Sequence, residues 1–469
     1  MPYIDYFLTS DTELTKDKLS ESELTRSLTT KLDLGSDNRT WNQEHLKALK
    51  LILCNIVTYL HEDKGVFLYS RKKKQIPHRF NPNDIKYSSL FFVIDKLVEA
   101  EILEGEIAPP RTKGKNPKKL SEFTVTQQVV DLAISLGISR LTVRTIDKFH
   151  VRLRDTETSE SLEFKQNEYT THIEALMVEY CRYLNQYNIL LSTEDYDLDT
   201  GEGITDLGLR GQPIHLYRNY RNYTEHKAYK DDINSLFIEI EDPNFNFGGR
   251  SGGYWQGNKG VDREFILIDG KKTKTADFPC SHLNLCYRHE TQQWFQTETH
   301  KELVEQGREH EDAYVVGYPR VHRDLIKHMV MIMFNVKGRR AVSKVFNDWI
   351  GQKNKDKSRN APDELVPEYA KLDYSNTELM DLIEAKHPRV KDYFYKGKLA
   401  GQIIQWHEAN IMHHLADYFQ RIYDFPVLTV YDELICPEEH QPMVKDFMFS
   451  TANCELCDSL SLMSQIPHM

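Results

Sequence analysis

Long apolar runs are missing from this chain of 469 residues, of which 40% are hydrophobic and 28% are charged. No stretch of about 18 uninterrupted apolar residues occurs, so we expect no membrane-spanning helix and no membrane partner. The first residues lack a basic segment followed by an apolar one, so they do not indicate a secretion signal. The length favours two or three domains, each with a hydrophobic core.

Cysteine is also scarce. The seven scattered cysteines, an odd number, fit a reducing cytoplasm better than a disulfide framework, so we expect a cytoplasmic protein. Cys454 and Cys457 form a single CxxC without a second pair at finger-like spacing, which favours incidental thiols over a zinc site.

An excess of positive charge is absent as well, since the net charge is −11. Taken alone, this argues against a nucleic-acid partner. The sum hides two basic runs, however, at residues 71–74 and 111–119. A protein that is acidic overall can hold phosphates in local basic patches, although such runs are more often solvated surface.

The composition changes along the chain and predicts four segments. Residues 1–40 form a polar lead-in. Residues 41–130 carry helical apolar patterns at 46–61 and 87–102, then two strand-like segments around a basic, proline-rich loop. This order resembles a winged helix-turn-helix, in which the second helix or the wing meets nucleic acid; a purely structural domain is the alternative. Residues 131–210 favour helices, and residues 211–469 carry the chemistry.

A glycine-rich segment, FNFGGRSGGYWQGNKG, places Gly249 beside Arg250. Glycines allow the backbone to approach a ligand closely and leave the guanidinium exposed. Arg218 and Arg221, slightly earlier in the chain, add two more cations. A tight hairpin turn is the alternative explanation for the glycines.

Two acidic side chains stand at the ends of apolar strands. Asp277 ends the second of two strands joined by Asp269-Gly270, and Asp432 lies in an acidic turn between two short strands, in FPVLTVYDELICP. Carboxylates in such positions are suited to Mg²⁺, which prefers oxygen ligands and keeps positions open for phosphates. Each of them alone would more often be a turn cap or a surface hairpin.

A helix with cations on one face lies between these two acids, in PRVHRDLIKHMVMIMFNVKGRRAV. Arg323 and Lys327 are four residues apart and Phe334 follows seven later, so all three fall on the same side. Like charges at this spacing cost some stability, which indicates an anionic ligand such as a triphosphate. A solvated helix face is the alternative.

Taken together, these segments resemble the right-hand polymerases that include family A DNA polymerases and the phage-type single-subunit RNA polymerases. Gly249-Arg250 is similar to their template-contact motif, Asp277 to motif A, Arg323-x3-Lys327 to motif B and Tyr431-Asp432 to motif C. The resemblance covers residues 210–440. It implies an α+β fold with an antiparallel palm sheet, helical fingers, a thumb-like region at 131–210, and the small winged-helix-like domain in front.

The resemblance also implies template-directed synthesis with two Mg²⁺ ions, for which Mn²⁺ can substitute. The partners would be nucleoside triphosphates and nucleic acid, as DNA template with primer or nascent RNA. The implied site residues are Asp277, Asp432 and the Phe278 backbone carbonyl as metal ligands; Lys327 as a catalytic residue; Arg323, Lys327, Phe334, Asn335 and His282 for the nucleotide; and Arg250, Gly249, Arg218 and Tyr431 for template and primer.

Three positions depart from the family pattern. Tyr431 replaces the His that usually precedes the motif C Asp, and Asn335 replaces a sugar-sensing Tyr of the RNA polymerases. His282 stands where DNA polymerases carry a bulky gate and RNA polymerases a Gly, which favours deoxynucleotides. No set of spaced acids before residue 200 resembles a proofreading exonuclease, so we expect no proofreading.

Two alternatives remain at this point. An RNA polymerase or primase would use the same site without a primer. A catalytically inactive DNA-binding protein in replication or regulation would need only the winged-helix-like region, but such a protein has no reason to keep both acids, Arg323 and Lys327. A role in replication of a phage, plasmid or other mobile element, or in antiviral defence, is what the resemblance indicates.

Overall fold

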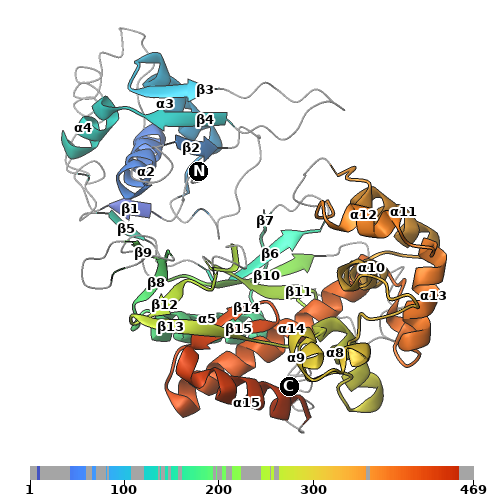
Figure 1. The fold of residues 1–469 in the computed structure, drawn as a ribbon. Helices are drawn as coiled ribbons and strands as arrows, with labels where there is room; N and C mark the ends of the chain where they lie inside the picture. Colours follow the sequence, from blue (N-terminus) through green and yellow to red (C-terminus); the bar gives the residue numbers. More distant parts are fainter. Residues whose placement is uncertain are drawn as a thin grey trace. The chain divides into compact units, whose positions relative to one another are not determined.

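The structure is a computed structural model, and it describes the chain in segments. These are residues 8–10, 43–59, 66–69, 81, 84–106, 121–135, 138, 143–145, 149–156, 161–193, 197, 203–206, 214–222, 245–253, 255–257, 263–354 and 360–453. The chain divides into two units, Met1–Phe149 and His150–Met469. Figure 1 shows both units, and each is described by itself below.

The first unit combines helices with a three-stranded antiparallel sheet. Its elements are β1 (Leu8–Ser10), α2 (Gln43–Tyr59), β2 (Val66–Tyr69), α3 (Tyr87–Glu99), β3 (Leu103–Glu106), β4 (Ser121–Val125), α4 (Gln127–Ser135) and β5 (Val143–Thr145). The sheet order is β2-β4-β3, and β1 pairs with β5. Helix α2 packs against α3 and α4 through apolar side chains that recur at helical spacing, among them the fully buried Leu49, Ile52, Val93 and Ile94. The basic runs at 71–74 and 111–119 lie outside the described residues.

The second unit contains a six-stranded antiparallel sheet in the order β14-β15-β13-β12-β8-β9. Its strands are β8 (Ile189–Ser192), β9 (Ile204–Asp206), β12 (Ile266–Ile268), β13 (Lys271–Asp277), β14 (Leu428–Val430) and β15 (Glu433–Pro437). Strands β12 and β13 form the expected hairpin, because Asp269 and Gly270 both take the positive φ angles, 49° and 75°, that a tight two-residue turn requires.

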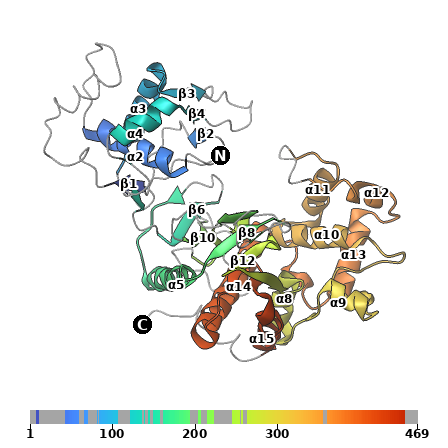
Figure 2. The ribbon, with the colours of Figure 1, turned by 60° about the vertical axis from the view of Figure 1, so that its left-hand side comes forward.

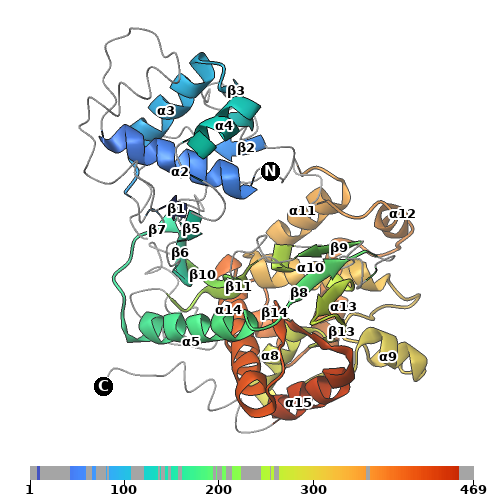
Figure 3. The same cartoon turned by 90° about the vertical axis from the view of Figure 1, so that its left-hand side faces the viewer.

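A four-stranded sheet in the same unit has the order β11-β10-β6-β7, with β10 and β6 parallel and the other pairs antiparallel. Its strands are β6 (Val151–Asp155), β7 (Ser161–Leu162), β10 (Tyr217–Asn222) and β11 (Gly248–Gly252), followed by the short helix η5 (Trp255–Gly257). Helix α5 (Glu168–Leu184) packs against β6, and α14 (Lys398–Tyr418) packs against β11 and β14. Figure 3 shows these two helices beside the strands.

The helices between residues 281 and 393 surround a second core beside the sheets, drawn in yellow and orange in Figure 2. They are α8 (Ser281–Thr291), α9 (His300–Glu305), η6 (Glu309–Glu311), α10 (Arg323–Asn335), α11 (Arg339–Ile350), α12 (Leu365–Ala370), α13 (Asn376–Lys386) and η8 (Lys391–Tyr393). Helix α14 joins the two cores, since Ile404 lies in the helical one and Trp406 and Leu415 lie in the one beneath the sheets. The chain continues through η9 (Phe419–Tyr423) and η10 (Glu438–His440) to α15 (Gln441–Asn453), which packs against β13 and β15.

The mixture of helices with several sheets is compatible with the expected α+β fold. The division of the chain differs from the expected one. Residues 131–149 group with the first unit, while residues 150–210 supply β6, β7, α5, β8 and β9 to the same sheets and core as residues 211–469. No helix among the described residues is both long and apolar enough to cross a membrane.

Candidate active site

Asp277 and Asp432 are brought to the same end of the six-stranded sheet. Asp277 is the last residue of β13, where it lies opposite Glu433 of β15, and Asp432 directly precedes Glu433 in the β14–β15 turn. The amide nitrogen of Phe278 donates a hydrogen bond of 3.1 Å to the backbone oxygen of Asp432. The turn is tight because Tyr431 takes a left-handed conformation, with φ 53°. The pairing of β13 with β15 therefore joins two acids that are far apart in the sequence.

The electrostatics at this sheet end favour binding of a cation. Asp277 is accessible to solvent, yet the surrounding protein, Asp432, Glu433 and Glu408 together raise its pKa to about 8. The pKa of Asp432 is also raised, first by burial and then by the charge of Glu408. Since mutual repulsion of carboxylates disfavours their charged forms, a bound cation would relieve it.

A buried carboxylate on α14 organises the other side of this acidic group. Glu408 is 2% exposed, and its Oε1 accepts hydrogen bonds from Arg250 Nε at 2.6 Å and Nη2 at 2.5 Å. Its Oε2 accepts from the Ser281 hydroxyl at 3.0 Å, and the Arg250 guanidinium lies 5.0 Å from the centre of the Tyr431 ring. Arg250 is thus held between a helix and the carboxylate-bearing turn. This places the expected template-contact residues Arg250 and Tyr431 beside Asp432.

His282 lies in the same network. Its ring is 3% exposed, with Nε2 at 3.5 Å from Glu408 Oε2 and 3.4 Å from Arg250 Nη2. Burial and the charge of Arg250 lower the pKa of His282 to about 3, so the imidazole is neutral at physiological pH. The ring meets the edge of Phe334, with centroids 5.9 Å apart.

Helix α10 presents its two cations differently. Lys327 is exposed, and its charge lowers the pKa of Asp277, so it lies within electrostatic reach of the carboxylates. Arg323 is held back by a completely buried Asp312, whose two oxygens accept from its Nε at 3.2 and 3.1 Å, and it lies over the Tyr314 ring at 5.0 Å. The side chain of Arg323 keeps 22% of its surface exposed, which leaves guanidinium N–H groups for a further ligand.

Phe334 does not face solvent as a nucleotide-stacking surface would require, and Asn335 is only partly exposed. Phe334 is fully buried between His282 and Phe394, so the expected stacking of this ring on a base is absent from this structure. Asn335 is partly buried and its Nδ2 donates to the Met331 carbonyl at 2.8 Å. Helical spacing placed Phe334 on the same side as the cations, but side chains from α8 and the segment after η8 cover it.

Arg218 and Gly249 contact each other inside the protein and help to hold the fold together. Arg218 is 1% exposed; its Nε donates to the Gly249 carbonyl at 2.7 Å and its Nη2 to Asn410 Oδ1 at 2.8 Å. The burial of Arg218 and its two hydrogen bonds inside the protein disagree with the expectation that it contacts template. Gly249 has φ +77°, and a Cβ atom there would lie 2.9 Å from Arg218 Nη2.

The Trp255-Gln256 segment closes against the carboxylate-bearing hairpin. Trp255 Nε1 and Gln256 Nε2 both donate to the Thr429 carbonyl, at 3.1 and 2.8 Å, and the Tyr431 hydroxyl donates to the Gln256 carbonyl at 3.3 Å. Trp255 is 1% exposed and belongs to the hydrophobic core.

Two carboxylates and a backbone carbonyl would suffice for magnesium. Among the described residues, no group of three or more His, Cys, Asp and Glu side chains is arranged to hold a metal. Mg²⁺ typically takes one or two carboxylates and completes its shell with water and substrate phosphates. Asp277 and Asp432, with the Phe278 carbonyl next in the chain, fit that donor set.

No protein-family model, curated protein or solved structure matches this chain.

Sequence reasoning missed Glu408, Ser281 and Asp312. Glu408 lies inside a long helix, with its partner Arg250 158 positions away. Asp312 lies in a loop between helices and could have been suspected only from the expectation that Arg323 needs a counter-charge. The sequence HEAN around Glu408 carries no local signal, since a glutamate in a helix is ordinarily a surface residue.

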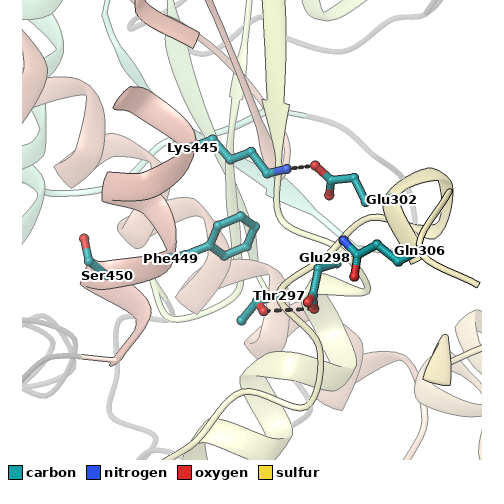
Figure 4. A pocket seen from close by; sticks show the side chains of 7 residues that line it. All are labelled: Thr297, Glu298, Glu302, Gln306, Lys445, Phe449 and Ser450. Carbon is teal, nitrogen blue, oxygen red and sulfur yellow. Dashed lines mark hydrogen bonds and ion pairs between the residues drawn. The ribbon is translucent and has the colours of Figure 1, made fainter. Parts of the chain in front are cut away.

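A shallow pocket of about 360 Å³ lies elsewhere, between α9 and α15. Figure 4 shows its lining, in which Lys445 forms an ion pair with Glu302 and Phe449 lies beside them. The acid Glu298 in this pocket is paired with Arg308 at 2.9 Å. Its charges are thus satisfied internally, and none of the expected site residues lines it.

Proposed function

We propose that this chain is a template-directed nucleic-acid polymerase of the right-hand type that joins nucleotides by two-metal phosphoryl transfer. The observation that carries the proposal is the pairing of Asp277 with the Asp432-Glu433 turn, which gathers two carboxylates at one sheet end beside the exposed Lys327 of α10. A lone acid at a turn is common, but two acids with a cationic helix in reach form the minimal set for this chemistry.

The architecture of the second unit supports the proposal. The six-stranded antiparallel sheet would be the palm, and the helical core around α10 would be the fingers. In the first unit, the order β2-β4-β3 with α2 and α3 is compatible with a winged helix that grips nucleic acid. We further propose a cytoplasmic setting and a role in the replication of a mobile element.

The mechanism assigns a task to each side chain. Bound Mg²⁺ ions would supply Lewis-acid activation of the primer 3′-hydroxyl and would offset the negative charge of the leaving pyrophosphate. Asp277, Asp432 and the Phe278 carbonyl would hold them. Lys327 would bind the triphosphate and give a proton to the departing pyrophosphate. Arg323 would contribute its remaining N–H groups, and Arg250, steadied by Glu408 and Tyr431, would contact the template backbone.

We also propose a preference for deoxynucleotides. His282 is a bulky residue five positions after Asp277, and its ring is locked against Phe334, Arg250 and Glu408. A locked side chain of this size leaves less room for a 2′-hydroxyl than a glycine would. Incorporation of dATP and ATP on one primed template measures the preference, and a clear preference for ATP would reverse this assignment.

Primer extension tests the proposed function. Wild-type protein with Mg²⁺ and a labelled primer–template should incorporate the nucleotide complementary to the first template base, and Asp277→Asn or Asp432→Asn should lose at least about 10³-fold in rate. Asp373→Asn is the matched control, because Asp373 is an exposed acid for which no ion pair is found among the described residues. Extension that is equal in all four proteins, or absent from wild type with every template offered, would overturn the proposal.

A further inference from the structure

One side of the four-stranded sheet carries a concentration of arginine that the proposed active site does not use. Along β6, Val151 and Leu153 are buried in the core with α5, while Arg152 and Arg154 between and after them are partly exposed. On β10, Tyr220 is buried with the same core, and Asn219 and Arg221 alternate with it. Because successive side chains of a strand point to opposite sides, these partly exposed residues share the side opposite to the buried Val151, Leu153 and Tyr220.

The register brings like charges together on this side. Strands β6 and β10 are parallel neighbours, and Arg221 lies opposite Arg154 while Asn219 lies opposite Arg152. Like charges directly opposite each other on adjacent strands destabilise a sheet. At the described strand positions on this side there is no Asp or Glu beside Arg154 and Arg221, since Asp155 alternates to the other side. Such an arrangement is favourable when an anion covers it.

Two polar atoms on this side also lack partners. Arg154 Nε and Asn219 Oδ1 are buried from solvent and have no hydrogen-bond partner. Beside them, the Tyr217 ring lies under the Arg152 guanidinium, 3.4 Å from the ring centre. The ring also lies so close over Gly252 that a Cβ atom there would collide with it. The glycine therefore lets Tyr217 lie flat and support the arginine.

This arginine face, defined as Arg152, Arg154 and Arg221 with Tyr217 and Asn219, continues into the candidate active site. Strand β11 is the next strand beyond β10, and its Arg250 lies opposite Asn219 before turning to Glu408. A chain of phosphates that reaches Arg250 could thus follow the same sheet past Arg221 and Arg154. Planar guanidinium groups bind phosphate oxygens in pairs, which makes arginine suited to such a backbone.

We propose that the arginine face binds the sugar-phosphate backbone of the primer–template duplex next to the active site. The proposal rests on the proposed polymerase function for the identity of its ligand. The binding is independent of base sequence, because the face offers cations to phosphates and its described residues lie on strands, which place no helix in a groove.

Equilibrium binding tests the proposal without catalysis. The full chain is titrated against a fluorescent primer–template duplex without divalent metal or nucleotide, at several salt concentrations. Arg154→Gln/Arg221→Gln should weaken binding by about 10-fold or more at 0.1 M salt, to the same extent for two unrelated sequences, and lower the slope of log affinity against log salt by about two. The matched control, Arg182→Gln/Arg421→Gln, removes the same charge from α5 and η9; Arg182 is exposed and Arg421 is paired with Asp417. It should bind like wild type.

The outcomes separate this inference from the proposed function. An unchanged affinity and salt slope in Arg154→Gln/Arg221→Gln, with folding verified by circular dichroism, would overturn the arginine face even if the protein extends primers. An equal loss in the Arg182→Gln/Arg421→Gln control would also overturn it, because the effect would then be one of net charge. A wild-type protein that binds duplex through these arginines but extends no primer would support the face and remove the polymerase proposal.

Discussion

The amide of Phe278 donates a hydrogen bond of 3.1 Å to the carbonyl of Asp432, one residue beyond the last paired position of β13 and β15. The bond extends the sheet ladder to the point where both strands carry an acid. The backbone, rather than a flexible loop, therefore sets the relative position of Asp277 and Asp432. Sites built on strands hold their side chains more precisely than sites on loops, which suits chemistry that depends on positioning.

Glu408 should act as a positioning residue for Arg250. Glu408→Gln keeps the size of the side chain but removes the charge that Arg250 and Ser281 share. We expect primer extension at limiting template to fall about 10- to 100-fold, mainly through a higher KM for template, as is usual when a supporting contact is lost. Kinetics over a range of template concentrations measure the split between KM and kcat. Glu368→Gln, which removes an exposed acid paired with Lys371, should leave both unchanged; a fall in kcat alone for Glu408→Gln would argue for a direct role in the chemistry.

Lys327 should matter for the rate rather than for stability. It is exposed and forms no hydrogen bond or ion pair among the described residues, so Lys327→Ala should leave the melting temperature unchanged. The rate of nucleotide addition should fall about 10²- to 10⁴-fold, the usual contribution of a general acid. Rapid-quench measurement of single additions gives this rate. Lys371→Ala, at the exposed end of α12, serves as the control, and comparable rates in the two variants would contradict the role of Lys327.

Gly249 should tolerate alanine worse than a glycine of similar conformation. Both Gly249 and Gly307 have positive φ, +77° and +70°, but an added Cβ meets Arg218 Nη2 at 2.9 Å in the first case and nothing within 4 Å in the second. Gly307→Ala should cost roughly 1 kcal/mol of unfolding free energy from backbone strain alone. Gly249→Ala should cost at least about 1 kcal/mol more, because the buried Arg218 must move. Urea unfolding compares the two variants. Equal losses of unfolding free energy would mean that Arg218 can move away from the added Cβ at no cost.

The free energy of unfolding should decrease as the pH falls below neutral, and His387 should account for part of this decrease. This ring is fully buried, with Nε2 donating to the Ala313 carbonyl at 2.9 Å and Nδ1 accepting from the Tyr287 hydroxyl at 3.2 Å. Burial lowers its pKa from 6.5 to about 4. Between these two pKa values the unfolded chain binds a proton at His387 and the folded chain does not. The contribution of this histidine to stability is therefore complete above about pH 6.5 and declines as the pH falls towards 4.

The variant His387→Gln isolates this effect. Glutamine stays neutral and can keep the hydrogen bond to the Ala313 carbonyl. Between pH 7.5 and pH 5 the free energy of unfolding of the variant should therefore fall by roughly 2 kcal/mol less than that of wild type, at about 1.4 kcal/mol per pH unit below pH 6.5. Urea unfolding at the two pH values measures the difference. His310→Gln, at a mostly exposed histidine, should follow wild type. An identical pH dependence in all three proteins would show that folding does not lower the pKa of His387.

Local patterns in the sequence predicted the strand ends that carry Asp277 and Asp432, because apolar runs and an Asp-Gly turn mark a hairpin without knowledge of its partners. The sequence also placed Lys327 on a helix. It could not show that Phe334, although in phase with Lys327, is covered by His282 and Phe394, since those neighbours come from other segments.

The burial of charged side chains could not be predicted from the sequence either. In the strand YRNYRN, Arg218 points inward to Gly249 and Asn410, whereas the aromatic Tyr217 points outward, the reverse of the usual alternation. Likewise Glu408 is buried because Arg250, far away in sequence, compensates its charge. Such pairs depend on the tertiary fold and leave no periodic trace in the chain.

The shared metal site is tested most directly by binding of Mn²⁺, followed through the electron paramagnetic resonance signal of the free ion. We expect wild type to bind Mn²⁺ in the presence of a nonhydrolysable nucleotide. Asp277→Asn, Asp432→Asn and the double variant should each lose that binding to a similar extent, because residues that act on one site are not additive. Losses that add independently, or binding that survives in both single variants, would show that the two carboxylates do not hold common ions and would contradict the account.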